Sequence, residues 1–122
     1  MMNKNDVVAV IMGGPSAERE ISLVTGAAIA GALREKGYNV AEIDLEPALQ
    51  LEECSAKVVF NAVHGMYGED GRLQTLLEML EIPYTGSGML ASALSMDKAA
   101  SKRIMQAAGI ATPKSLIFVK GE

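Results

Sequence analysis

The 122-residue sequence has only one cysteine, Cys54. A lone cysteine cannot form an intrachain disulfide, which excludes a disulfide-stabilised secreted domain and predicts a reducing, cytoplasmic setting. The sequence also has no run of about 20 apolar residues that could span a bilayer and no apolar core of a signal peptide near its start. We therefore expect neither secretion nor membrane insertion.

Positive charge is scarce and scattered. Eleven Lys and Arg against 15 Asp and Glu give a formal net charge of -4, and no cationic cluster occurs. Nucleic acids and anionic membranes bind clustered positive charge, so neither is an expected partner. At 49% hydrophobic, the chain can bury one core with at most the start of a second domain. Small molecules or other proteins are the expected partners.

Short apolar segments alternate with glycine-containing turns. Val7–Met12 and Lys57–Val63 are continuous apolar runs, which are typical of strands buried on both faces. Asn39–Ile43 and Ile82–Thr85 are predicted as shorter strands. The acidic segment Asp44–Ser55 is predicted as a connection with a helical turn.

Two segments between these strands have apolar residues at helical spacing. They are Ile21, Val24, Ala28 and Ala32 in the first, and Leu73, Leu76, Leu77 and Leu80 in the second. Gly37 is placed to end the first helix in a left-handed turn. Strands that alternate with helices predict an α/β fold with an open parallel sheet of Rossmann-like topology.

The last third of the chain differs from this pattern. Residues 89–108 are predicted to be helical, with a change of direction at Asp97 if that residue caps a new helix. Its apolar stripe is expected to be partly uncovered, which favours self-association. Lys114–Val119 is predicted as a strand. A strand needs a neighbour, so this one is expected to belong to a second domain.

In an open parallel sheet, ligands gather at the loops that follow the C-terminal ends of the strands. Three glycine-containing loops occupy this position: Gly13–Arg19, His64–Gly71 and Gly86–Gly88. The first has neither the spaced glycines of a dinucleotide site nor the Gly-Lys-Ser/Thr of a phosphate-binding loop. Standard Rossmann cofactor binding is therefore not expected.

Glu18 and His64 are the candidate ligand-binding residues of these loops. Glu18 begins a predicted helix, whose dipole keeps a carboxylate ionised and able to hold an ammonium group, although stabilising the helix terminus is an equally simple role. His64, the only histidine, is expected near Glu18, but a histidine at a strand end is as often structural as catalytic. Glu69 and Asp70 resemble a metal-ligand pair, yet a turn with a helix cap is the favoured interpretation.

Four motifs follow one another along the chain. They are GGPSAEREIS at 13–22, AVHG with GEDG at 62–71, PYTGSG at 83–88 and ASALSMDK at 91–98. In this order and spacing they resemble the D-alanine–D-alanine ligase family, over residues 7 to 119. The resemblance implies an ATP-grasp enzyme in which residues 1–88 form the N-terminal, pre-ATP-grasp substrate-binding domain and residues 89–122 begin the central ATP-grasp domain.

The resemblance also implies roles for four residues. Glu18 matches the carboxylate that holds the ammonium of the first D-alanine, and His64 matches a histidine of the same pocket. Ser16, in the same motif as Glu18, is expected to bind substrate as well. Lys98 matches a lysine that reaches the phosphates of ATP. The implied activity joins two D-alanines through a D-alanyl phosphate for peptidoglycan synthesis, with ATP and Mg²⁺, in a homodimer. The magnesium ligands are expected outside these 122 residues, and the chain alone is expected to be inactive.

Three alternatives remain open at this stage. The second substrate of a ligase of this kind is D-alanine, D-lactate or D-serine. The chain is otherwise a non-catalytic module that binds an amino acid between Glu18 and His64. In a third interpretation it is an assembly domain whose glycine-containing loops bind no ligand.

Overall fold

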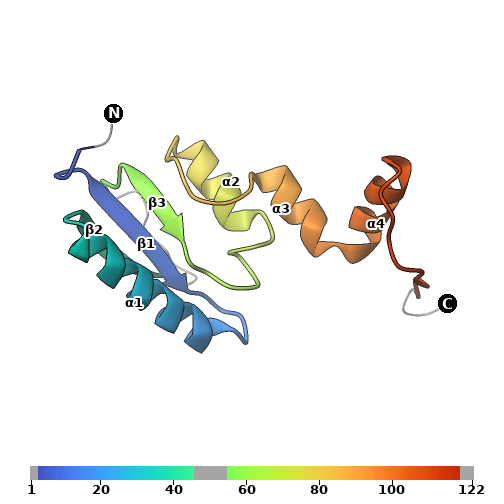
Figure 1. Ribbon diagram of the computed structural model, residues 1–122, viewed down its shortest axis with the longest axis horizontal. Coiled ribbons are helices and arrows are strands. Elements are labelled where there is room, and N and C mark those ends of the chain that lie inside the picture. Colours follow the sequence, from blue (N-terminus) through green and yellow to red (C-terminus); the bar gives the residue numbers. More distant parts are fainter. Residues whose placement is uncertain (1–2, 46–54, 119–122) are drawn as a thin grey trace.

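A three-stranded parallel sheet forms the centre of the fold (Figure 1). The computed structural model describes residues 3–45 and 55–118. In these ranges the strands are β1 (Val7–Gly13), β2 (Asn39–Leu45) and β3 (Val58–Asn61), in the order β2-β1-β3. The central strand β1 is buried from Val8 onward because it has a neighbour on each edge and a helix over each face.

Two helices cover opposite faces of this sheet. Alternate β1 residues point to opposite faces. On one face, buried Val10 and Met12 pack with α1 (Arg19–Glu35). On the other, Ile11 packs with α2 (Arg72–Met79). This is the expected α/β arrangement, with one helix in each layer.

The face of α1 that packs on the sheet consists of small residues. Ser22, Gly26 and Ala30 are buried there. A methyl group on Gly26 would lie 2.5 Å from Cβ of Met12, so only glycine allows this close approach of helix to strand. The apolar residues whose spacing predicted the helix lie on its opposite side, and Val24 is 72% exposed.

Several predicted boundaries shift in the structure. β2 continues to Leu45, so Asp44 is a strand residue, and the helical turn predicted next falls, like Cys54, outside the described residues. The third strand is shorter than predicted because its last two residues have no ladder partner beyond one hydrogen bond from Ala62 N to Ile11 O. The predicted fourth strand is reduced to a single parallel bridge between Val59 and Tyr84.

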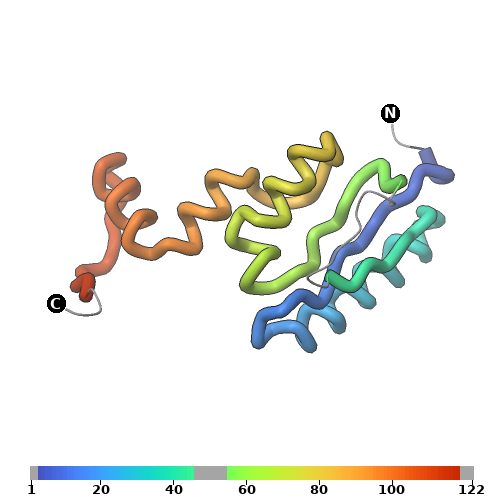
Figure 2. Tube along the Cα trace, turned by 180° about the vertical axis from the view of Figure 1, so that it is seen from behind, coloured from blue at the N-terminus to red at the C-terminus, as the bar shows by residue number. Residues whose placement is uncertain are grey.

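Beyond residue 88 the chain extends away from the sheet as two helices, α3 (Met89–Met96) and α4 (Lys98–Ala107) (Figure 2). The predicted change of direction is confirmed at Asp97, whose side chain accepts a hydrogen bond of 2.9 Å from Ala100 N. The strand predicted from Lys114 is wrong for residues 114–118, which have no neighbouring strand. Phe118 is 86% exposed there, and the stripe of the preceding helices is also partly uncovered, as expected.

Substitution of two leucines in α2 tests how much its packing against the sheet stabilises the fold. Leu77 is fully buried, so Leu77→Ala should lower the free energy of unfolding by about 2–5 kcal/mol, because it removes buried methyl groups and leaves a cavity. Leu76, which is 37% exposed, is the matched control, and Leu76→Ala should cost much less. Urea unfolding followed by circular dichroism measures both, and equal losses would contradict the burial difference.

Candidate functional site

The loops that follow β1 and β3 are joined by Ser16. Its hydroxyl donates a hydrogen bond of 2.8 Å to the backbone carbonyl of His64 and accepts one of 3.1 Å from the backbone N–H of Glu18. One side chain thus connects both candidate ligand-binding residues. The predicted proximity of these two loops is confirmed.

Gly65 brings the second loop against the side chain of Glu18. A methyl group in place of its hydrogen would lie 2.9 Å from Oε2 of Glu18 and 3.2 Å from Oγ of Ser16, and its φ of +69° is left-handed. Both facts favour glycine at this position. The Glu18 carboxylate therefore lies directly beside the loop that begins at His64, and its side chain is exposed to incoming ligands.

The ends of β1 and β3 are held together beneath these loops by Ser22. Its hydroxyl accepts a 2.8 Å hydrogen bond from Gly13 N and donates one of 2.7 Å to the carbonyl of Ala62. Ser22 is fully buried, so both partners would otherwise lack a hydrogen bond in a water-free setting. These two hydrogen bonds connect α1 to the C-terminal ends of β1 and β3, and so fix the starting points of the two loops that follow these strands.

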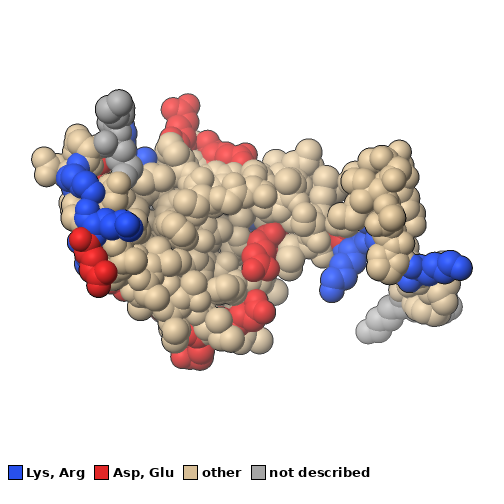
Figure 3. Space-filling model, in the orientation of Figure 1, with Lys and Arg blue, Asp and Glu red and all other residues tan. Residues whose placement is uncertain are grey.

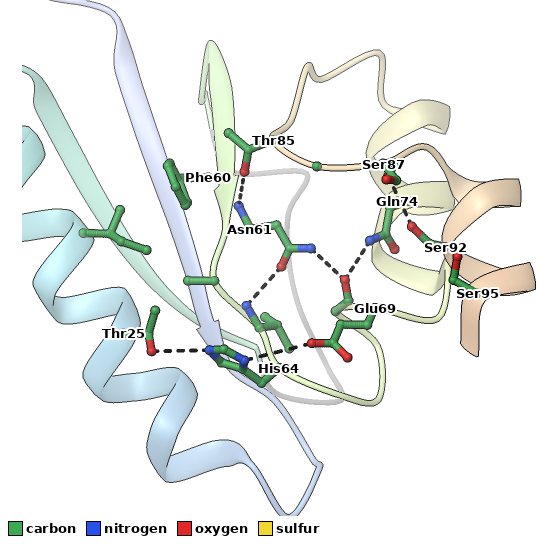
Figure 4. A pocket seen from close by; sticks show the side chains of 15 residues that line it. Thr25, Phe60, Asn61, His64, Glu69, Gln74, Thr85, Ser87, Ser92 and Ser95 are labelled. Carbon is green, nitrogen blue, oxygen red and sulfur yellow. Dashed lines mark hydrogen bonds and ion pairs between the residues drawn. The ribbon is translucent and has the colours of Figure 1, made fainter. Parts of the chain in front are cut away.

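The imidazole of His64 lines a pocket of about 420 Å³ (Figure 4). Its Nε2 lies 3.3 Å from Oγ1 of Thr25 on α1, and its Nδ1 lies 4.0 Å from a carboxylate oxygen of Glu69. Phe60 and Ile29 form apolar parts of the wall. The pocket therefore combines an apolar side with hydrogen-bonding groups, as small-molecule sites do.

The loop that carries Glu69 is held by two amide side chains. The carbonyl of Gly68 accepts hydrogen bonds from Nδ2 of Asn61 at 2.8 Å and from Nε2 of Gln74 at 2.7 Å (Figure 4). A methyl group on Gly68 would lie 2.2 Å from the carbonyl oxygen of Val63, so the loop is packed tightly against the end of the strand segment. These contacts fix the position from which Glu69 faces the histidine.

Asp70 forms the turn that was predicted for the Glu69–Asp70 pair, but the predicted helix cap is wrong, because α2 has no side-chain capping hydrogen bond. Its carboxylate accepts hydrogen bonds from the backbone N–H groups of Tyr67 at 3.1 Å and Arg72 at 3.2 Å, while Gly71 takes the N-cap position of α2. In ranges 3–45 and 55–118, no three His, Cys, Asp or Glu side chains are grouped as metal ligands would be.

An ion pair holds the start of α1 against the end of β2. Nη1 of Arg19 donates to Oδ1 of Asp44 at 2.7 Å, and Nη2 of the same guanidinium contacts Oδ2. The hydrogen bond from Arg19 holds the pKa of Asp44 below its usual value, while partial burial opposes that shift. The pair lies one residue from Glu18 and restrains the backbone there.

Lys98 lies apart from this pocket, as the first residue of α4. Its side chain is exposed, and, like Glu18 and Ser16, it does not line the pocket that contains His64. Basic side chains are visible over the α4 end of the molecule in Figure 3, whereas most acidic ones in that view lie over the sheet part. The structure thus groups Glu18, Ser16 and the His64 loop, and places Lys98 on a separate helix.

The sequence reasoning did not identify Thr25, Ser22, Asn61 or Gln74 as part of this site. A signal for two of them existed, because Ser22 and Thr25 interrupt the apolar sequence of α1 on the side toward the sheet and pocket. Asn61 and Gln74 gave no comparable signal, since their common partner is a backbone carbonyl.

Comparison with known proteins agrees with these observations. A family model described as "D-ala D-ala ligase N-terminus" matches residues 45–87. D-alanine–D-alanine ligases of Syntrophotalea carbinolica and Moorella thermoacetica are 53% and 54% identical to the chain over 117 residues, which is 94% of its length. The chain belongs to the D-alanine–D-alanine ligase family, matching its N-terminal part.

A crystal structure of the D-alanine–D-alanine ligase from Bacillus anthracis complexed with ATP matches the fold with a TM-score of 0.87, at 40% identity over 96% of this chain. This confirms the α/β fold with a parallel sheet, which the chain shares with a ligase of the ATP-grasp family. The chain spans 41% of that protein and about 38% of the two curated ligases. No helix within the described ranges is both long and apolar enough to cross a bilayer.

The Arg19–Asp44 pair predicts a defined pH dependence of stability. Because the pKa of Asp44 is lower in the folded state, the pair should stabilise the protein above the unfolded-state value of about 3.9 and lose that effect as the pH falls through the folded-state value. Asp44→Asn should therefore lower stability near neutral pH and have little effect in strong acid. Urea unfolding from pH 2 to 7 measures this, with exposed Glu20→Gln as the control, and a pH-independent difference would contradict it.

Proposed function

We propose that the chain is the substrate-binding part of an enzyme that joins two D-alanines with conversion of ATP to ADP and phosphate, through a D-alanyl phosphate, in the cytoplasm for cell-wall synthesis. The observation that carries this proposal is the Ser16 bridge, because it connects the Glu18 and His64 loops at the ends of two parallel strands. Family membership supplies the reaction, and the bridge supplies a site where one substrate can be held.

Glu18 is the proposed partner of the ammonium group of the first D-alanine. It occupies the N-cap position of α1, but its side chain makes no capping hydrogen bond, so its carboxylate oxygens are not used by the helix. A charge-assisted hydrogen bond to an ammonium is roughly twice as strong as a neutral one. Ser16 and His64 complete the proposed subsite. Catalysis by such a site consists chiefly of positioning and charge neutralisation.

Lys98 is the proposed contact to the phosphates of ATP. From residue 97 to 118 the chain has four basic residues and one acidic residue, Asp97; the basic ones are Lys98, Lys102, Arg103 and Lys114. This local excess of positive charge fits an anionic nucleotide. We accordingly propose residues 1–88 as the substrate-binding domain and 89–122 as the start of the ATP-binding domain. Mg²⁺ would be held by residues of the ligase other than those described here.

A homodimer is also part of the proposal. The outer face of α1, defined by Ile21, Val24, Ala28 and Ala32, is exposed throughout. No charged residue occurs between Glu20 and Arg34 in this helix. An uncharged apolar helix face on the surface is typical of an interface, and a second copy of the chain is the proposed occupant.

The activity is tested with the product of the full reading frame and with the 122-residue chain. We expect phosphate release from ATP and Mg²⁺ with D-alanine, not with L-alanine, and only from the longer protein. D-lactate and D-serine, each added with D-alanine, define the second substrate. Glu18→Gln should raise the KM for D-alanine roughly tenfold or more, since it replaces a charged hydrogen-bond acceptor by a neutral one. Glu20→Gln, on the same helical turn, is the matched control.

The outcomes separate the alternatives. If the longer protein releases no phosphate but D-alanine still binds the chain, an amino-acid-binding module replaces the ligase proposal. If Glu18→Gln changes neither turnover nor binding, Glu18 does not hold the substrate. If the longer protein releases no phosphate and D-alanine does not bind the chain, an assembly domain becomes the better description.

The proposed dimer makes a separate prediction. Val24→Glu places a charge in the centre of the outer face of α1, so it should convert a dimer to a monomer at micromolar concentration without unfolding the chain. Met79→Glu introduces the same charge at a residue of α2 that is 77% exposed and should leave the mass unchanged. Light scattering coupled to size exclusion measures both, and a monomeric wild type would refute the proposed interface.

A further inference from the structure

The two ring nitrogens of His64 face two different side chains. Nε2 faces the hydroxyl of Thr25 on α1 at 3.3 Å, and Nδ1 faces the carboxylate of Glu69 in the β3–α2 loop at 4.0 Å. Figure 4 shows the ring between these residues, at the wall of the pocket. In a neutral imidazole one nitrogen carries the proton and the other accepts, so these neighbours bear on which nitrogen carries it.

The neighbours differ in what they can do. An ionised carboxylate only accepts hydrogen bonds, whereas a threonine hydroxyl both donates and accepts. A proton on Nδ1 is attracted to Glu69 and leaves Nε2 to accept from Thr25. A proton on Nε2 would instead turn the lone pair of Nδ1 toward a negative charge. The ring with its proton on Nδ1 is therefore favourable at both nitrogens, whereas the ring with its proton on Nε2 is unfavourable at Nδ1.

The distance to Glu69 has a further consequence. A hydrogen bond from nitrogen to oxygen is about 2.7–3.2 Å long, so at 4.0 Å the carboxylate attracts the proton on Nδ1 without occupying it as a hydrogen-bond partner. That N–H remains able to donate to another acceptor. The side chain of His64 is 37% exposed, which leaves room for a ligand to approach.

The other acidic groups near the ring are directed elsewhere. The carboxylate of Asp70 accepts from the backbone of Tyr67 and Arg72, and the Arg72 guanidinium also pairs with it at 3.6 Å. Glu18 lies beside Gly65, and the ion pair of His64 is with Glu69. Among the residues that the structure describes, Glu69 is the carboxylate paired with His64, and its own backbone N–H is bonded to Gly65 O at 3.0 Å.

We propose that Thr25 and Glu69 are positioning residues that place the proton of the neutral His64 ring on Nδ1, so that this nitrogen donates a hydrogen bond to a ligand oxygen. The identity of that ligand as D-alanine rests on the proposed function, but the protonation of the ring does not. Glu69 acts by its charge, and Thr25 acts by occupying Nε2.

His64 is the only histidine of the chain, so its side-chain nitrogens can be observed without ambiguity by NMR of the ¹⁵N-labelled protein. At alkaline pH, where a histidine is ordinarily neutral, the protonated and unprotonated nitrogens have widely separated chemical shifts. We expect the proton on Nδ1 in the wild type. Glu69→Gln and Thr25→Val should each shift the population toward Nε2, the nitrogen that carries the proton in most neutral free histidine.

Glu20→Gln is the control, because it removes an exposed carboxylate from the helix that carries Thr25. Backbone amide spectra establish that each variant is folded. Glu69→Gln changes the neighbour of Nδ1 and Thr25→Val the neighbour of Nε2, so if one variant fails to fold, the other still tests the proposal. A wild type protonated on Nε2 would overturn the proposal. So would an unchanged proton position in a folded Glu69→Gln or Thr25→Val protein.

A second experiment examines the donor role in the longer ligase. The amide nitrogen of asparagine reaches about as far from the backbone as Nδ1, and that of glutamine about as far as Nε2. His64→Asn should therefore retain a KM for D-alanine roughly tenfold lower than His64→Gln, at a similar kcat. The reverse order would overturn the donor assignment. If the longer protein has no ligase activity, the proposed function fails while the NMR result still decides the position of the proton.

Discussion

The site depends on the buried hydroxyl of Ser22. This group satisfies the N–H of Gly13 and the carbonyl of Ala62, which belong to neighbouring segments of the sheet, and it belongs to the helix that follows the first of them. Two chain segments and a helix are therefore fixed by one oxygen atom without access to water. An unpaired polar group at this depth costs about 1–3 kcal/mol, so the arrangement is specific as well as stable. Glu18 lies five residues after Gly13, and His64 lies two residues after Ala62.

Much of the fold could be predicted from local sequence. The long apolar run around Ile11 marks a strand with two buried faces, and this property places it at the centre of the sheet. Asp97 reveals a helix start because its side chain caps the backbone locally. Tyr84 shows the limit of such reasoning. The segment around Tyr84 pairs with β3 at one bridge only. The length of such a pairing depends on both strands, and the sequence of one segment does not show how its neighbour is placed.

The site could be predicted in outline, but its details could not. Glycine-containing loops at strand ends predicted where Glu18 and His64 lie, since parallel strands all end at one edge. The orientation of His64 was not predictable, because it depends on Thr25, which is 39 residues away in sequence. Glu69 was understood from sequence as a turn residue. Its relation to the ring follows from the fold of the loop, which is set by contacts to backbone atoms.

The single residue between α3 and α4 has a mechanical consequence. Asp97 has φ -87° and ψ 96°, while the residues on both sides are helical, so rotation between the two helices is concentrated at this one bend. The ten residues of α4 rise about 15 Å, and a rotation of roughly 10° at the bend would move the far end of the helix by about 2.6 Å. Lys98 immediately follows the bend and would hardly move. Such a rotation would therefore change the direction of α4 while leaving the backbone of Lys98 nearly in place.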